Sequence, residues 1–276
     1  MSANVGRKFL SPLSAPEKTA DRHAPCVGSL LPSLSEGSCA TRAYDPSRIL
    51  LDFPSETHGC SSAVAVVAMR YASGMSLRRL PAADGALIQI VDAALADATR
   101  RSGEWLVCRP GCTQCCVGVF AINQLDAIRL QQGLSDREKV DPQKARRIRA
   151  RARDSIRRLS AEFPGDAKTG VLDEGPEAEA SFAEFANDEP CPVLDPETGL
   201  CDLYDARPMT CRTFGPPVRS DGGLGVCELC FHGATDEQIA GCEMVADPDD
   251  LEAKVLAKLE ESQSARGRTI VAFCVK

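Results

Sequence analysis

The sequence predicts a mainly α-helical protein with little β-structure and an irregular, cysteine-rich core that is organised by bound metal. Apolar residues recur at helical spacing on both sides of the cysteine-rich region. Between Cys108 and Cys230, nine cysteines fall in two blocks that are typical of metal ligands. Aromatic residues make up only 5% of the chain, so the core must depend on aliphatic side chains and on whatever the cysteines organise.

The composition limits both the size of the fold and the kind of partner. With 276 residues, the chain is long enough for one or two domains. Its net charge of −7 gives no general basis for binding nucleic acid or an anionic membrane. The longest apolar stretch, residues 63–69, is far too short to span a bilayer, and the N-terminus lacks the apolar run of a secretory signal. We therefore expect a cytoplasmic protein in a reducing environment, where clustered cysteines bind metals more often than they form disulfides.

Residues 1–75 differ from the rest of the chain. They are rich in Ser and Pro and show no sustained helical or strand period, so they bury too little apolar surface to offset the entropy lost on ordering. We predict a disordered leader, or a start codon assigned too far upstream. Cys26, Cys39 and Cys60 are irregularly spaced, which argues against a metal site there. Residues 76–276 are expected to form a single cysteine-cluster metal-binding domain with its core at residues 104–232.

Four helices and one strand are predicted in that domain. Asp84 is a good N-cap for a helix over residues 84–103, and a short helix is expected to end near Gly133. A longer helix is predicted over residues 136–163, and an amphipathic helix over residues 248–263. The β-branched and aromatic content of residues 269–275 predicts a short C-terminal strand.

The long helix over residues 136–163 carries a basic face. That face could bind nucleic acid, or it could be a solvated face that pairs with the acidic stretch at residues 173–189. We favour the second interpretation because no aromatic platform or nucleic-acid motif accompanies the charges. The basic residues are Lys144, Arg146, Arg147, Arg149, Arg151, Arg153, Arg157 and Arg158.

The cysteine spacing points to metal binding. Two pairs, Cys112 with Cys115 and Cys227 with Cys230, have the two-residue gap that lets a tight turn aim two sulfurs at one ion. One such pair is a weak signal, but two pairs together with further cysteines are a strong one. The complete set of predicted ligands is Cys108, Cys112, Cys115, Cys116, Cys191, Cys201, Cys211, Cys227 and Cys230.

The number of ligands favours more than one simple site. A zinc ion and a 4Fe–4S cluster each take four ligands, so nine candidates would fill two sites and leave one over. Cys115 and Cys116 are adjacent, and neighbouring side chains on an extended backbone point in different directions, so the two can serve different sites or one can act as a redox partner. His232 and Cys242 are weaker additional candidates.

Arginines close to the cysteines can offset the negative charge of a thiolate site. Arg207 and Arg212 flank Cys211 and are predicted to interact with the bound cofactor from outside its ligand shell. The alternative for Arg207 is an ordinary loop role, in which it forms a salt bridge with Asp202 or Asp205.

The two blocks together resemble the YkgJ-type cysteine-cluster family, described as a zinc- or iron-chelating domain. The resemblance is carried by the spacing of the first four cysteines, by Cys191-Pro-x-Leu, and by the run from Cys201 through Arg207-Pro208 to Cys211-Arg212-x-Phe214. It covers about residues 104–232. The resemblance implies metal chelation by Cys108, Cys112, Cys115, Cys116, Cys191, Cys201 and Cys211, and it implies no particular reaction.

Three functions follow from these observations. The leading hypothesis is an iron–sulfur protein with a redox or accessory role, which would need a redox protein partner, because zinc alone would leave five cysteines without a role. The second is a zinc-stabilised structural or interaction module without catalysis, and the third is metal storage or delivery. A nucleophilic-cysteine enzyme is disfavoured because the chain holds only three histidines, two of them in the leader. Whether the protein is an enzyme stays open.

Overall fold

The computed structural model describes residues 79–220, 223–263 and 266–276. All of them belong to a compact unit that includes Met75–Lys276. The predicted leader and its three cysteines lie outside the described residues. None of the described helices is long and apolar enough to cross a membrane.

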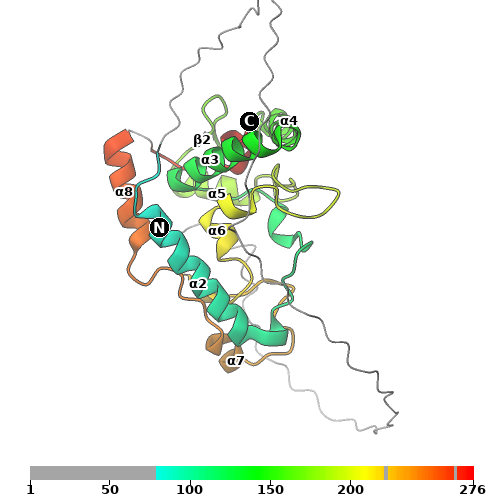
Figure 1. The fold of residues 1–276 in the computed structure, drawn as a ribbon, viewed down its shortest axis with the longest axis vertical. Coiled ribbons are helices and arrows are strands. Elements are labelled where there is room, and N and C mark those ends of the chain that lie inside the picture. Colours follow the sequence, from blue (N-terminus) through cyan, green and yellow to red (C-terminus); the bar gives the residue numbers. More distant parts are fainter. Residues whose placement is uncertain (1–78, 221–222, 264–265) are drawn as a thin grey trace, which may run out of the picture. The chain divides into compact units, whose positions relative to one another are not determined.

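The described part of the chain is mainly α-helical, as predicted (Figure 1). Short 3-10 turns lie close to the cysteines at η1 (Gly103–Trp105), η2 (Gln114–Cys116) and η3 (Tyr204–Ala206). Two small antiparallel sheets pair β1 (Gly165–Asp166) with β2 (Val171–Leu172), and β3 (Val218–Ser220) with β4 (Gly223–Gly225). The helices are α2 (Asp84–Ser102), α3 (Gln124–Val140), α4 (Pro142–Leu159), α5 (Pro176–Glu184), α6 (Met209–Arg212), α7 (Asp236–Gly241), α8 (Leu251–Gln263) and α9 (Val271–Cys274).

The boundary between α3 and α4 differs from the prediction. Gly133 does not end a helix, since α3 continues through it to Val140, and the next helix begins at Pro142 rather than at residue 136. The side chain of Asp141 accepts a hydrogen bond of 2.9 Å from the N–H of Lys144, and Pro142 occupies the first helical position. This Asp-Pro pair is a helix-start signal in its own right.

Gly133 has a packing role instead. A Cβ atom at this position would lie 2.4 Å from the Cβ of Ala206 in η3, so α3 can approach the second cysteine block only where a side chain is missing. We expect Gly133→Ala to lower the free energy of unfolding by about 1–3 kcal/mol, the usual effect of overpacking, although alanine favours helices. Gly85→Ala in α2 is the matched control, because its Cβ would meet nothing within 4 Å. Thermal unfolding should show opposite signs for the two variants, and a stabilised Gly133→Ala protein would contradict the close approach.

The prediction of a C-terminal strand is wrong. Thr269 forms only an isolated antiparallel bridge with Ile122, and residues 271–274 then turn into the short helix α9. Residues 270–275 are all buried, so no alternation of inward and outward side chains exists for a sheet face. Packing on several sides has overridden the β-propensity of these residues, which is itself context-dependent.

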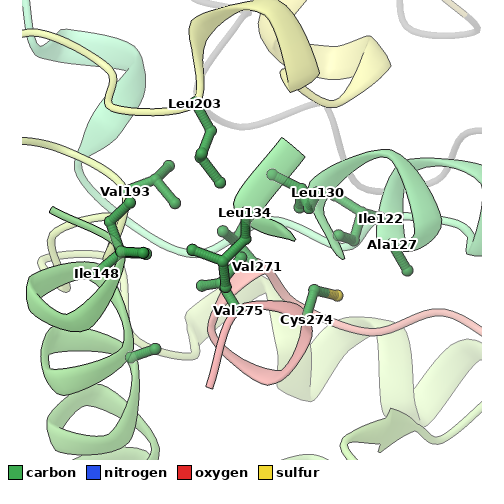
Figure 2. Packing of buried hydrophobic residues seen from close by; sticks show 12 residues of the cluster. Ile122, Ala127, Leu130, Leu134, Ile148, Val193, Leu203, Val271, Cys274 and Val275 are labelled. Atoms are coloured by element: carbon green, nitrogen blue, oxygen red, sulfur yellow. The ribbon is translucent and has the colours of Figure 1, made fainter. Parts of the chain in front are cut away.

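The largest apolar cluster joins α3, α4 and α9 to the second cysteine block. Figure 2 shows Leu134 of α3 close to Val271 of α9 and to Val275, which directly follows α9; Leu130, Val193 and Leu203 belong to the same cluster. Cys191 and Cys201 pack against the same cluster. The loops that carry two predicted ligands are therefore anchored in the core.

A buried ionic network links α2 to α3. Asp84 was predicted to cap α2, but Ala83 occupies the cap position, and the carboxylate of Asp84 instead pairs with the guanidinium of Arg129. Arg129 Nη1 also lies 2.5 Å from Asp126 Oδ1. The three side chains are buried, with residue exposures of 4%, 5% and 2% for Asp84, Arg129 and Asp126. Burial raises the pKa of Asp126 to about 6 despite the nearby Arg129 charge.

Candidate metal centre

The two cysteine blocks are joined through their backbones. Cys116 ends the first block in η2, and its carbonyl accepts a hydrogen bond of 2.8 Å from the N–H of Cys191 in the second block. An antiparallel bridge pairs Val117 with Pro190 beside this bond, and another pairs Leu194 with Cys201. Cysteines that are distant in sequence are thereby held in one region of the fold.

Helix α4 fixes the loops of the second block. Arg151 Nε donates to the carbonyl oxygen of Pro192 at 2.8 Å, and Arg151 Nη2 lies 2.7 Å from Asp202 Oδ2. Lys144 Nζ lies 3.0 Å from Asp202 Oδ1. Because Pro192 and Asp202 each directly follow a cysteine, these cations hold both cysteine loops against α4.

Part of the basic face of α4 is therefore used inside the chain. Arg149 pairs with Glu138, and Arg158 pairs with Glu189 of the acidic stretch that was considered as a partner. Other cations of this helix, among them Arg146, are exposed. The ion pairs agree with the interpretation of a face that is paired and solvated.

Five of the predicted ligands interact with one another and form what we call the larger thiol group. A hydrogen bond from the Cys116 thiol lowers the pKa of Cys115 to about 7, and the same bond raises the pKa of Cys116. Burial raises the pKa of Cys211 well above its ordinary value, and the charges of neighbouring thiols raise it further. The group consists of Cys115, Cys116, Cys191, Cys201 and Cys211.

Three further ligands form the smaller thiol group: Cys108, Cys227 and Cys230. Hydrogen bonding with Cys227 and Cys230 raises the pKa of Cys108, while the bond with Cys108 lowers the pKa of Cys230 to about 3. The N–H of Cys230 donates to the carbonyl of Cys227 at 2.9 Å, which closes the turn predicted from their spacing. Gly215, at φ +119°, lies so close that a Cβ there would be 3.1 Å from Cys108 Sγ.

The environments of the two groups differ. Cys227 and Cys230 are buried in an apolar cluster with Phe231 and Ile239, whereas Cys108 is exposed. Every member of the larger group is partly buried. Cys115 interacts electrostatically with Cys227 as well as with its own group, so it lies between the two.

Within the described residues, no three His, Cys, Asp or Glu side chains are arranged so that they could hold a metal ion. The sulfurs gather in two neighbourhoods without converging on a common point. The donor chemistry fits a soft cation, because thiolates favour zinc and iron–sulfur clusters. Convergence would require side-chain rotation and loss of the thiol protons, steps that metal binding couples to folding. Organisation of the core by metal therefore stays a prediction.

Cys112 belongs to neither thiol group. It is partly buried in the first block, and its N–H donates to the carbonyl of Arg109 at 2.9 Å. In the sequence, Cys112 lies between Cys108 of the smaller group and Cys115 of the larger one.

The two predicted arginines have different surroundings. The positive charge of Arg207 contributes to lowering the pKa of Cys115 and opposes the effect of burial at Cys201. Its guanidinium carbon lies 3.6 Å from the centroid of the Tyr204 ring, and its Nε donates to the Tyr204 carbonyl. The alternative partner Asp202 is instead paired with cations of α4, as described above. Arg212 is buried and turns to α2, where Nη1 lies 2.7 Å from Asp92 Oδ1.

Cys242, Cys274 and His232 lie outside the predicted ligand set. The thiol of Cys242 donates to the carbonyl of Arg101 at 3.3 Å and packs in the apolar cluster of the smaller group. Cys274 is buried on α9, where burial raises its pKa to about 12. His232 is exposed. No local pattern in the sequence marks the carboxylates that support these loops. Asp92 is the main example, because its partner Arg212 lies 120 positions further along the chain.

Comparison with known proteins finds one family match. Residues 107–230 match the model of the CxxCxxCC family, a putative zinc- or iron-chelating domain. This segment is therefore similar to the CxxCxxCC family. The matched segment spans every predicted ligand from Cys108 to Cys230, so it includes both thiol groups. No curated protein and no solved structure matches the chain.

Proposed function

We propose that the segment similar to the CxxCxxCC family binds metal through its two thiol groups, and that the larger group holds an iron–sulfur cluster of the 4Fe–4S type. The observation that carries this proposal is the gathering of five thiols from both cysteine blocks around Cys115, with loops fixed by α4. A 4Fe–4S cluster needs four cysteine thiolates, and five candidates satisfy that number.

A redox or accessory role fits the surroundings of this group. The guanidinium of Arg207 acts on two of its thiols, and charge close to cluster sulfurs tunes the reduction potential. Such a role requires a redox protein partner, and a reducing compartment such as the cytoplasm keeps the thiols available. The cluster would supply electron transfer, while the residues of the chain bind it and set its electrostatic environment.

The second candidate is a zinc-stabilised interaction module without catalysis. The smaller thiol group favours it, because a CxxC turn buried in an apolar cluster is typical of structural zinc sites. Each structural zinc site contributes on the order of 10 kcal/mol to folding. A core with 5% aromatic residues would depend on that contribution.

Anaerobic purification of the full chain distinguishes the two candidates. We expect a brown protein with broad visible absorbance that bleaches on reduction, and with iron and acid-labile sulfide in equal amounts. A colourless protein that contains zinc but no sulfide would reject the cluster and support the interaction module.

A further inference from the structure

Helix α2 lies outside the segment that matches the family, yet it contacts α6, the short helix that carries Cys211. Figure 1 shows α2 and α6 side by side. With only four residues, α6 has little stability of its own, so its position depends on what holds its ends.

The C-terminal end of α6 is held to α2 through Arg212. Its Nη1 lies 2.7 and 2.9 Å from the two carboxylate oxygens of Asp92. Its Nε donates to the carbonyl of Arg207 at 3.2 Å, and Nη2 donates to the carbonyl of Asp205. The side chain of Arg212 is 4% exposed and that of Asp92 is 47% exposed, so the cation is buried and its partner lies at the surface.

The N-terminal end of α6 is held by the buried network of α2 and α3. Asp126 Oδ1 accepts a hydrogen bond of 2.9 Å from the N–H of Met209, the first residue of α6. Asp126 is paired with Arg129, and Arg129 in turn with Asp84 of α2. Both ends of the four-residue helix are thus connected to carboxylates of α2.

Loss of Asp92 would leave a buried cation without its carboxylate. The charge that remains on Arg212 would be largely desolvated, with only the carbonyls of Arg207 and Asp205 as partners, and a buried charge without a counter-charge is costly. The least costly response is for Arg212 to move toward water, and α6 would move with it. Cys211 directly precedes Arg212, so its sulfur would lose its position in the larger thiol group.

We propose that α2 is a functional part of the metal centre, and that Asp92 is a positioning residue for Cys211 through Arg212. This inference rests on the proposed function, since it assigns Cys211 to the ligand set. Substitution of such supporting residues typically lowers metal affinity about 10- to 100-fold.

The test compares Asp92→Ala with the wild-type full chain in two measurements. The first is metal affinity, in competition with a chelator, where we expect the 10- to 100-fold loss typical of lost supporting contacts. The second uses the reduced, metal-free protein and follows the alkylation rate of each thiol by peptide mass spectrometry. We expect alkylation of Cys211 to be several-fold faster in the variant, while the buried thiol Cys274 keeps its rate.

Two further variants separate positioning from general stability. Asp154→Ala removes a carboxylate of similar exposure, 52%, which pairs with Arg157 at the surface of α4, and it should change neither measurement. Asp92→Glu keeps a carboxylate within reach of Arg212 and should restore slow alkylation of Cys211. If Asp92→Ala fails to fold, Asp92→Asn, which keeps an oxygen acceptor, replaces it.

The outcomes are distinguishable. Unchanged affinity and unchanged Cys211 alkylation in Asp92→Ala would overturn the inference and leave the proposed function intact. Equal acceleration of Cys211 and Cys274 would show a merely structural role and would overturn it as well. A wild-type chain that binds no metal would refute the proposed function, and the alkylation pattern would still show whether Asp92 positions Cys211.

Discussion

Replacing Arg129 by leucine is expected to lower the free energy of unfolding by about 3–5 kcal/mol, because two buried carboxylates lose the charge that compensates them. Arg129 Nε lies 3.0 Å from Asp84 Oδ1, and Nη1 lies 2.5 Å from Asp126 Oδ1. Leucine fills much of the volume but leaves the carboxylates without a cation. Urea unfolding followed by circular dichroism measures the change.

The control for this prediction is Lys139→Met on the same helix. Lys139 pairs with Asp136 at the surface, where the side chains are 72% and 71% exposed, and such pairs contribute little. We expect no measurable change in that variant. Equal stability of Arg129→Leu and the wild type would mean that the buried network makes no net contribution, and it would remove one of the two connections from α2 to α6.

Single Cys→Ser substitutions are expected to separate the two thiol groups. Cys191→Ser should lower the metal content of the larger group and leave that of the smaller one unchanged, and Cys227→Ser should do the reverse. Each substitution removes one thiolate of a metal site, and metal binding to cysteine sites contributes free energy on the order of 10 kcal/mol. Metal and sulfide analysis of each purified variant measures the losses.

Cys242→Ser is the matched control for this series. Cys242 is buried in the same apolar cluster as Cys227 and Cys230, but its thiol is directed to the carbonyl of Arg101. The variant should keep its full metal content. If Cys191→Ser and Cys227→Ser each lost all metal, the two groups would have to be one shared site.

The sequence predicted those parts of the fold that depend on local signals. The helical period of residues 84–103 predicted α2 (Asp84–Ser102), and the two-residue gap between Cys227 and Cys230 predicted their turn. The Asp141-Pro142 pair is a local start signal for α4, whereas Gly133 serves a close approach to Ala206. That role depends on a distant element, so no local pattern could have shown it.

Long-range contacts account for the other differences. The C-terminal residues have strand propensity but are buried on several sides, so α9 forms instead of a strand. The division of the thiols into two groups depends on the bond between Cys116 and Cys191 and on the approach of Cys108 to Cys230. The spacing of the cysteines predicted a set of candidate ligands. Their division into two groups depends on the fold and could not be predicted from spacing.

The central claim is that the thiols of this domain bind metal jointly. Native mass spectrometry of the freshly purified, anaerobic full chain tests it most directly, combined with alkylation of the same sample under native conditions. We predict a mass that exceeds that of the bare chain by the mass of a 4Fe–4S cluster or of zinc. The thiols of both groups should be protected from alkylation until a chelator is added. The account would be contradicted by a chain that has the mass of the bare polypeptide and in which Cys108 and Cys115 are alkylated at the same rate with and without chelator.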